Sequence, residues 1–196
     1  RAMYIVDSVI TKNHGQNGQP DWKIVRCDDS NVQLYKSYVE ALALGDTLKI
    51  NELKYLENSL TTLEKIIGTI LGTEMNAVVL NIKSGDGAIT IPMQAECITQ
   101  VQTEPPRFNN IEYLLSMFKN YGIYTIGRVT SFQDDTLAKY NEYQHAIKNP
   151  DGSIWLDDNR SAWVDAYDEW VQNYNIAAAK EAALAGFDEI NFDYVR

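Results

Sequence analysis

Charged side chains interrupt the last apolar stretch of the sequence, Gly186–Arg196, which otherwise has the composition of a buried strand. The polar residues toward its end are Asn191, Asp193 and Arg196. A carboxylate in such a strand costs free energy unless it is paired or used in chemistry. Two interpretations stay open on these residues alone: Asp193 belongs to a functional site, or it forms a salt bridge at a strand end.

Two earlier strand-like runs also end in charges. The run Asn76–Lys83 leads into a turn that carries Asp86, and the run Ile123–Val129 has Arg128 near its end, with Asp134 just beyond. Functional groups in parallel α/β proteins gather at the carboxyl ends of the strands. We therefore expect these charges to lie at one edge of one sheet.

Hydrophobic periodicity and the positions of glycines predict the helices and strands that carry these charges. Between Asn51 and Leu71, apolar residues recur at spacings of three and four, which predicts one long amphipathic helix that ends at Gly72. Further helices are predicted over 111–121, 134–144 and 166–185, and strands over 2–10, 76–83, 123–129 and 186–196. This alternation indicates an α/β protein with a parallel sheet.

The region 11–50 has no clear period and is interpreted as an irregular insertion in a βα loop. It contains glycines, a proline and two β-like pieces, around Trp22–Val25 and Val32–Val39. An alternative places the first strand of the sheet at Tyr38–Leu44 and leaves the N-terminus as an appended strand.

Composition narrows the classes of partner. The chain has 196 residues and a formal net charge of -10, which disfavours nucleic acid. Cys27 and Cys97 lack the spacing of a zinc site or a disulfide framework, and His14 and His145 are expected to be solvated. No apolar run is long enough for a membrane helix, and no Walker or Rossmann glycine motif occurs. No cofactor and no metal are therefore predicted.

An aromatic cluster follows the third predicted strand. Its members are Trp155, Trp163, Tyr167 and Trp170, the last two at the start of the last predicted helix. Aromatic side chains on loops above a parallel sheet commonly stack on sugar or base rings, but they also pack loops onto the protein. Both interpretations stay open.

Three groups of residues recur as motifs in a known family. They are Asn76–Lys83 with Asp86–Gly87, Gly122–Val129 with Asp151–Trp155 and Trp163–Asp165, and Tyr174–Ala183 with Gly186–Arg196. Taken together they resemble a bacterial family of putative glycoside hydrolase domains, whose members are (β/α)8 barrels. The last group is close to the family pattern G-F-D-E-I-x-F-D-Y-V-R and is the most specific. The resemblance covers about the last two-thirds of the chain.

The sequence also departs from that family. Asn81 and Ala166 stand where the family has Asp and commonly Pro, and the family continues past the residue that matches Arg196 with several more βα units. The resemblance therefore implies a TIM-barrel type of fold of which residues 1–196 supply the first half, about four βα units. The missing C-terminal half or another copy of the chain is expected to complete it.

The resemblance implies hydrolysis of glycosidic bonds in a poly- or oligosaccharide, which usually needs two carboxyl groups. Asp193 is expected to be the nucleophile or base, kept ionised by Arg128 and Arg196. Asp86 is named as the second catalytic carboxylate, while Asp134 is an alternative partner and the missing half of the barrel is an equal alternative source of the general acid. The predicted substrate-binding residues are Lys83, Arg128, Asp134, Trp155, Trp163, Asn191, Tyr194 and Arg196. For this function we expect an extracellular or cell-envelope location.

Two alternatives to an enzyme are retained. One is a non-catalytic carbohydrate-binding or cell-wall-associated module on the same scaffold, and the other is a structural domain whose charged strand ends form mutual salt bridges. A second carboxylate at roughly 5 to 10 Å from Asp193 would favour the enzyme.

Overall fold

The computed structural model describes residues 1–5, 27–102, 104–108 and 110–195. The chain divides into two compact units, the first comprising residues 1–79 and 113–125 and the second residues 80–112 and 126–196. The expectations for His14, for Arg196, for Trp22–Val25 and for residues 6–10 of the first strand fall outside the described residues.

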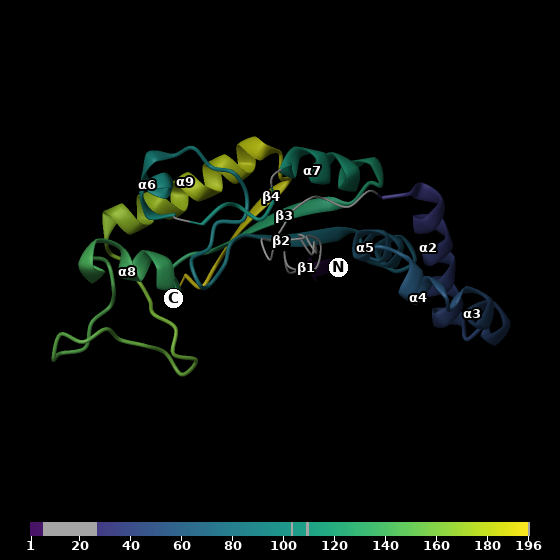
Figure 1. The fold of residues 1–196 in the computed structure, drawn as a ribbon, viewed down its shortest axis with the longest axis horizontal. Helices are drawn as coiled ribbons and strands as arrows, with labels where there is room; N and C mark the ends of the chain where they lie inside the picture. The colour runs from purple at the N-terminus through teal and green to yellow at the C-terminus, as the bar shows by residue number, and fades with distance from the viewer. Residues whose placement is uncertain (6–26, 103, 109, 196) are drawn as a thin grey trace, which may run out of the picture. The chain divides into compact units, whose positions relative to one another are not determined.

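Four strands form one sheet in the order β1-β2-β3-β4. They are β1 (Ala2–Ile5), β2 (Ala77–Lys83), β3 (Tyr124–Thr130) and β4 (Glu189–Asp193), labelled in Figure 1. β3 and β4 run parallel, with Arg128 opposite Asn191 and Thr130 opposite Asp193. The predicted α/β class and the positions of the four strands are confirmed, the first of them over the residues of β1.

The predicted β-like piece Val32–Val39 is wrong, and so is the alternative first strand Tyr38–Leu44. Both lie inside one helix, α2 (Asp29–Leu44). The carboxylate of Asp28 caps its first turn by accepting a backbone hydrogen bond, and Gly45 ends the helix with a φ of 70°. These two end signals flank a segment that strand propensity alone misassigns.

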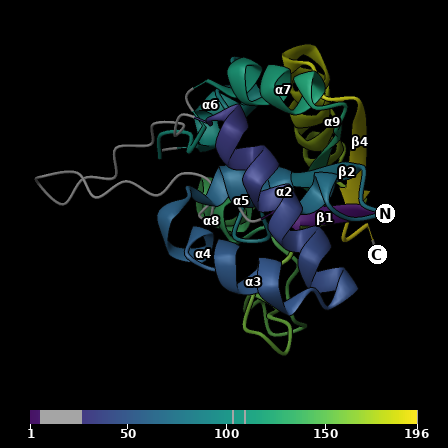
Figure 2. The same ribbon diagram turned by 90° about the vertical axis from the view of Figure 1, so that its right-hand side faces the viewer.

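Burial of one helical face outweighs the strand propensity of the valines in α2. Val32 and Tyr38 are buried on this face, and α2 packs against α5 (Thr62–Leu71), as Figure 2 shows. The two backbones approach closely because Gly68 has no side chain. A Cβ atom there would lie 2.9 Å from the Cβ of Tyr35.

The single helix predicted over 51–71 is also wrong. Three helices occupy the region, α3 (Thr47–Leu53), α4 (Leu56–Ser59) and α5. The last break comes from a capping box, in which Thr61 accepts from the backbone of Glu64 and the Glu64 carboxylate accepts from the backbone N–H of Thr61. A capping box starts a new helix at Thr62 even though the leucine spacing continues through it.

The remaining helices are α6 (Glu96–Val101), α7 (Ile111–Asn120), α8 (Asp135–Tyr143) and α9 (Glu169–Ala185). α7 and α9 are confirmed, and α8 is confirmed over its first part only, because Tyr140, Asn141 and Glu142 have non-helical backbone angles. α6 was not predicted. α9 begins after Asp168, whose carboxylate accepts from the N–H of Trp170, and ends at Gly186 with a φ of 107°. The αβ step from α9 through Gly186 into β4 is thus as the sequence predicts.

Gly127, in the middle of β3, leaves room for apolar side chains on one face of the strand. A Cβ atom there would lie 3.1 to 3.3 Å from side-chain atoms of Ile82, Ile190 and Phe187, which pack on that face. Side chains alternate along a strand, so Arg128 points to the opposite face. This opposite face carries the polar residues of the candidate site.

Candidate functional site

An ion pair between neighbouring strands forms the centre of the candidate site. The Nε and Nη2 atoms of Arg128 on β3 lie 2.8 and 2.7 Å from Oδ2 of Asp193 on β4. Nη1 of Arg128 also donates to Oδ1 of Asn81 on β2 at 3.0 Å. One guanidinium therefore links three consecutive strands and fixes the carboxylate at the carboxyl end of β4, where the sequence predicted a charge.

The backbone after Asp193 is in an unusual conformation. Tyr194 has a φ of 53°, and its N–H donates to Oδ1 of Asp193 at 2.8 Å. The Tyr194 ring lies 5.5 Å from the guanidinium carbon of Arg128. Positive φ angles in residues other than glycine cluster at functional sites, although four further residues in the described part of the chain also have them. Both oxygens of Asp193 are thus held, Oδ2 by Arg128 of β3 and Oδ1 by the N–H of the residue after β4.

Aromatic side chains continue outward from Tyr194. The Trp163 ring lies 5.8 Å from the Tyr194 ring, and the Trp155 ring lies 6.5 Å from that of Trp163. Trp163 is 8% exposed and Trp155 is 39% exposed. The structure therefore brings together Asp193, Tyr194 and the two tryptophans that the sequence identified as aromatic candidates.

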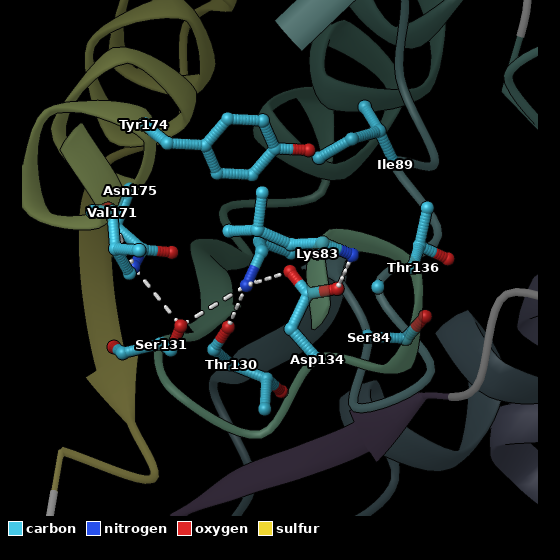
Figure 3. A network of polar contacts seen from close by, with 12 residues as sticks. Lys83, Ser84, Ile89, Thr130, Ser131, Asp134, Thr136, Val171, Tyr174 and Asn175 are labelled. Atoms are coloured by element: carbon cyan, nitrogen blue, oxygen red, sulfur yellow. Dashed lines mark hydrogen bonds and ion pairs between the residues drawn. The ribbon is translucent and has the colours of Figure 1, made fainter. Parts of the chain in front are cut away.

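Lys83 and Asp134 form a second ion pair (Figure 3), and neither side chain is exposed to solvent. Nζ of Lys83 lies 2.8 Å from Oδ2 of Asp134 and donates to the carbonyl oxygens of Thr130 and Ser131 at 2.6 and 3.1 Å. Oδ1 of Asp134 accepts from the N–H of Leu137. The side chains of Lys83 and Asp134, both predicted to bind substrate, are 0% exposed and make these contacts within the protein.

The enclosed pair connects to Asp193 through the end of β3. Lys83 holds the carbonyl of Ser131, and the N–H of Ser131 donates to the carbonyl of Asp193 at 2.8 Å. Asn175 of α9 donates to the same Ser131 carbonyl at 2.9 Å (Figure 3). Lys83 therefore positions the backbone on which Asp193 stands.

Tyr174 and Gly87 lie next to the Lys83–Asp134 ion pair. Nζ of Lys83 lies 5.8 Å from the centroid of the Tyr174 ring, whose hydroxyl accepts from Gln102. Burial, with a further contribution from the charge of Asp134, raises the pKa of Tyr174 far above its ordinary value. A Cβ atom at Gly87 would come within 2.0 Å of Oδ1 of Asp134. The turn after β2 therefore requires glycine at this position.

Asp86 lies in the turn after β2, separated from β4 by β3 in the sheet. Its Oδ1 accepts from the hydroxyl of Ser84 and from the N–H of Ala88, and Arg107 lies 4.0 Å from Oδ2. Partial burial raises the pKa of Asp86, but these hydrogen bonds and the Arg107 charge outweigh it and lower the pKa below its usual value. Strands are about 4.8 Å apart, so the ends of β2 and β4 are separated by roughly 10 Å.

Asn191 lies on β4 opposite Arg128 and is exposed, on the same face as Asp193 by strand alternation.

The part of the chain that the structure describes holds no group of three or more His, Cys, Asp or Glu side chains suited to a metal ion. Among the same residues, no helix is both long and apolar enough to cross a bilayer.

The prediction that His145 is a solvated residue is wrong. His145 is 4% exposed, its Nδ1 lies 2.6 Å from Oδ2 of Asp168, and its ring stacks on Trp170 at 4.7 Å. Burial raises the pKa of Asp168, but hydrogen bonds from His145 and from the N–H of Trp170 outweigh this effect and lower the pKa below its usual value. The local sequence around His145 is polar, and nothing in it signals a partner 23 residues away.

Comparisons with known proteins give the family of the chain and a similar fold. A family model described as a putative glycosyl hydrolase domain matches residues 54–196. A crystal structure of a hypothetical protein from Ruminiclostridium thermocellum ATCC 27405 is similar in fold, with a TM-score of 0.63 and 25% identity over 99% of this chain and 76% of that one. The search of curated proteins gave no match. The family match covers well over half of the sequence and includes β2, β3 and β4, so the chain belongs to the family described as a putative glycosyl hydrolase domain.

Proposed function

We propose that this protein hydrolyses glycosidic bonds in a poly- or oligosaccharide and that Asp193 is its nucleophile or general base. The observation that carries the proposal is the fixed Asp193 carboxylate at the carboxyl end of a parallel strand, beside strained Tyr194. A neighbouring guanidinium favours the ionised form of a carboxyl group, which either role requires. Membership of a glycosyl hydrolase family supports the reaction class.

The strand order supports a barrel as the scaffold of this reaction. Consecutive strands are neighbours in the sheet, β3 and β4 run parallel, and a helix precedes β4, as in a (β/α)8 barrel. We propose that residues 1–196 supply about four βα units of such a barrel. The remaining strands would come from further parts of the full protein or from another copy.

The contacts favour different roles for the other predicted residues. Asp86 has a lowered pKa and suits a base rather than an acid, because a general acid must hold its proton near neutral pH. Asn191, Tyr194 and the two tryptophans are proposed to bind the sugar, together with Arg196. Lys83 and Asp134 are proposed to position the ends of β2 and β3 rather than to contact it.

A second candidate function is carbohydrate binding without hydrolysis. The aromatic row from Tyr194 to Trp155 favours it, since sugar rings pack on aromatic faces whether or not a bond is broken. This function would need neither an ionised Asp193 nor a general acid.

The test compares the full-length protein with its Asp193→Asn and Glu189→Gln variants on a panel of soluble and insoluble polysaccharides. Glu189 is a matched control because it is an exposed carboxylate at the opposite end of the same strand. We expect the release of new reducing ends to fall at least about 100-fold in Asp193→Asn and to be unchanged in Glu189→Gln. Binding of a polysaccharide without any new reducing ends would favour the binding module and overturn the enzyme.

A further inference from the structure

We propose that the loop around Trp155 forms a second sugar-binding position, which takes an uncharged sugar unit of an oligosaccharide whose scissile bond lies near Asp193. This inference deepens the proposed function and rests on it for the identity of the ligand. The loop spans residues 144–168, leaving α8 and returning to α9 (Figure 1).

The loop contains a hollow with a tryptophan exposed in it. The residues that line the hollow are Ile147, Trp155, Asp157, Asp158, Asn159 and Trp163. Trp155 is 39% exposed and Ile147 is 38% exposed, so both offer apolar surface there. Binding sites for small molecules combine such surface with a few polar groups that fix orientation.

Trp155 is held by the Trp163 ring and by its own backbone. The Trp163 ring packs against it at an interplanar angle of 70°, and Nε1 of Trp163 donates to Oδ2 of Asp157 at 3.0 Å. The N–H of Trp155 donates to the carbonyl of Ile147 at 2.9 Å, and the N–H of Ile147 donates to the carbonyl of Trp163 at 2.8 Å. A ring that is already fixed loses little entropy when a ligand packs on it.

The polar residues of the hollow suit hydroxyl groups and disfavour anions. The side chains of Asp158 and Asn159 are exposed at its rim, and together they offer acceptors and a donor. Asp157 is fully used by the loop, because it also accepts from the N–H groups of Asn159 and Ser161. Two carboxylates beside the tryptophan would repel a uronic acid, so the position fits a neutral sugar.

The aromatic row links this position to the carboxylate. Trp163 contacts Trp155 on one side and Tyr194 on the other, and Tyr194 follows Asp193 directly. A saccharide that begins at Asp193 and follows these rings reaches Trp155 only if it has several units. The geometry therefore points to affinity that rises with chain length, since the second contact is made within one molecule.

The test measures calorimetric binding of oligosaccharides to full-length Asp193→Asn protein, so that no ligand is cleaved. The probes are β-1,4-linked glucose, β-1,4-linked N-acetylglucosamine and α-1,4-linked glucose oligomers of two and five units. We expect the five-unit member of at least one series to bind about tenfold more tightly than the two-unit member. Adding Trp155→Ala should remove this difference, whereas Trp155→Phe should keep most of it.

Tyr167→Ala is the matched control, because Tyr167 is 92% exposed on the same loop and lies outside the hollow. It should leave the length dependence unchanged. The proposal is overturned if no series binds. It is also overturned if the Trp155→Ala variant keeps the difference in affinity between the two-unit and five-unit oligomers. Cleavage by the unsubstituted protein is scored separately, so loss of length dependence without any cleavage would support the position and reject the hydrolase.

Discussion

At the scale of single residues, the candidate site contains two ion pairs with opposite exposure. Arg128 and Asp193 lie at the surface of the second unit, with side-chain exposures of 13% and 47%, whereas Lys83 and Asp134 have none. A buried charge is tolerated only when its partner and its hydrogen bonds are in place. The Asp193 carboxylate is therefore accessible from outside, whereas the atoms of the second pair contact only other protein groups.

Removing one partner of the enclosed pair should destabilise the protein strongly. Lys83→Met leaves the Asp134 carboxylate buried without its cation, and we expect the free energy of unfolding to fall by about 3 to 5 kcal/mol. The double variant Lys83→Met/Asp134→Leu should recover much of this loss, because no lone charge remains. Urea unfolding measures both changes.

Lys180→Met is the control, because Lys180 is exposed on α9 and should change stability by less than about 0.5 kcal/mol. A Lys83→Met variant as stable as this control would show that the enclosed pair does not hold the end of β3.

At the scale of elements, the first unit depends on the start of α5. Glu64 is 3% exposed, and its carboxylate accepts from the N–H groups of Asp28 and Thr61 and from the side chain of Asn31. Burial raises the pKa of Glu64, but these hydrogen bonds together lower it below its ordinary value of 4.5. One carboxylate thus joins the start of α2 to the start of α5.

The lowered pKa gives a pH dependence with a definite sign. A carboxyl group with a lower pKa in the folded state stabilises the fold above its unfolded pKa, and this stabilisation is lost as pH falls through the folded pKa. We expect Glu64→Gln to reduce the free energy of unfolding at pH 7 by about 1 to 3 kcal/mol and to reduce it less near pH 3. Urea unfolding at the two pH values tests this.

Glu52→Gln serves as the comparison, since Glu52 is exposed on α3. An equal loss for Glu64→Gln at both pH values would mean that shape rather than charge matters at this position.

Local signals predicted the elements better than they predicted the contacts between them. Gly186 and the alanine-rich segment before it sufficed to place α9 and β4. The box of Thr61 and Glu64 was present in the sequence, but the leucine period hid the break that it causes. The enclosure of Lys83 and of His145 depends on Asp134 and Asp168, which are distant in sequence, and no local pattern identifies such partners.

At the scale of the whole molecule, the net charge of -10 sets a preference among polysaccharides. Long-range repulsion should weaken binding of anionic chains, and dissolved salt should screen it, with a Debye length of about 10 Å at 0.1 M. We therefore expect galacturonic acid oligomers to bind Asp193→Asn protein more weakly than neutral oligomers of equal length. The gap should narrow as sodium chloride rises from about 0.02 to 0.5 M. Calorimetry at both salt concentrations measures it.

The neutral series provides the internal reference, because its affinity should not depend on salt. Equal affinities of the neutral and the acidic series at low salt would contradict the preference and, with it, the role given to the carboxylates around Trp155.

Gly127 has a consequence for how such proteins diverge. Its missing side chain makes room for Ile82, Ile190 and Phe187, each within 3.3 Å of where a Cβ atom would be. An alanine at this position needs a smaller neighbour, and a smaller neighbour leaves a void unless position 127 grows. The four positions should therefore change together in evolution, so that relatives differ here by compensated sets of substitutions while Arg128, on the opposite face, is free of this constraint.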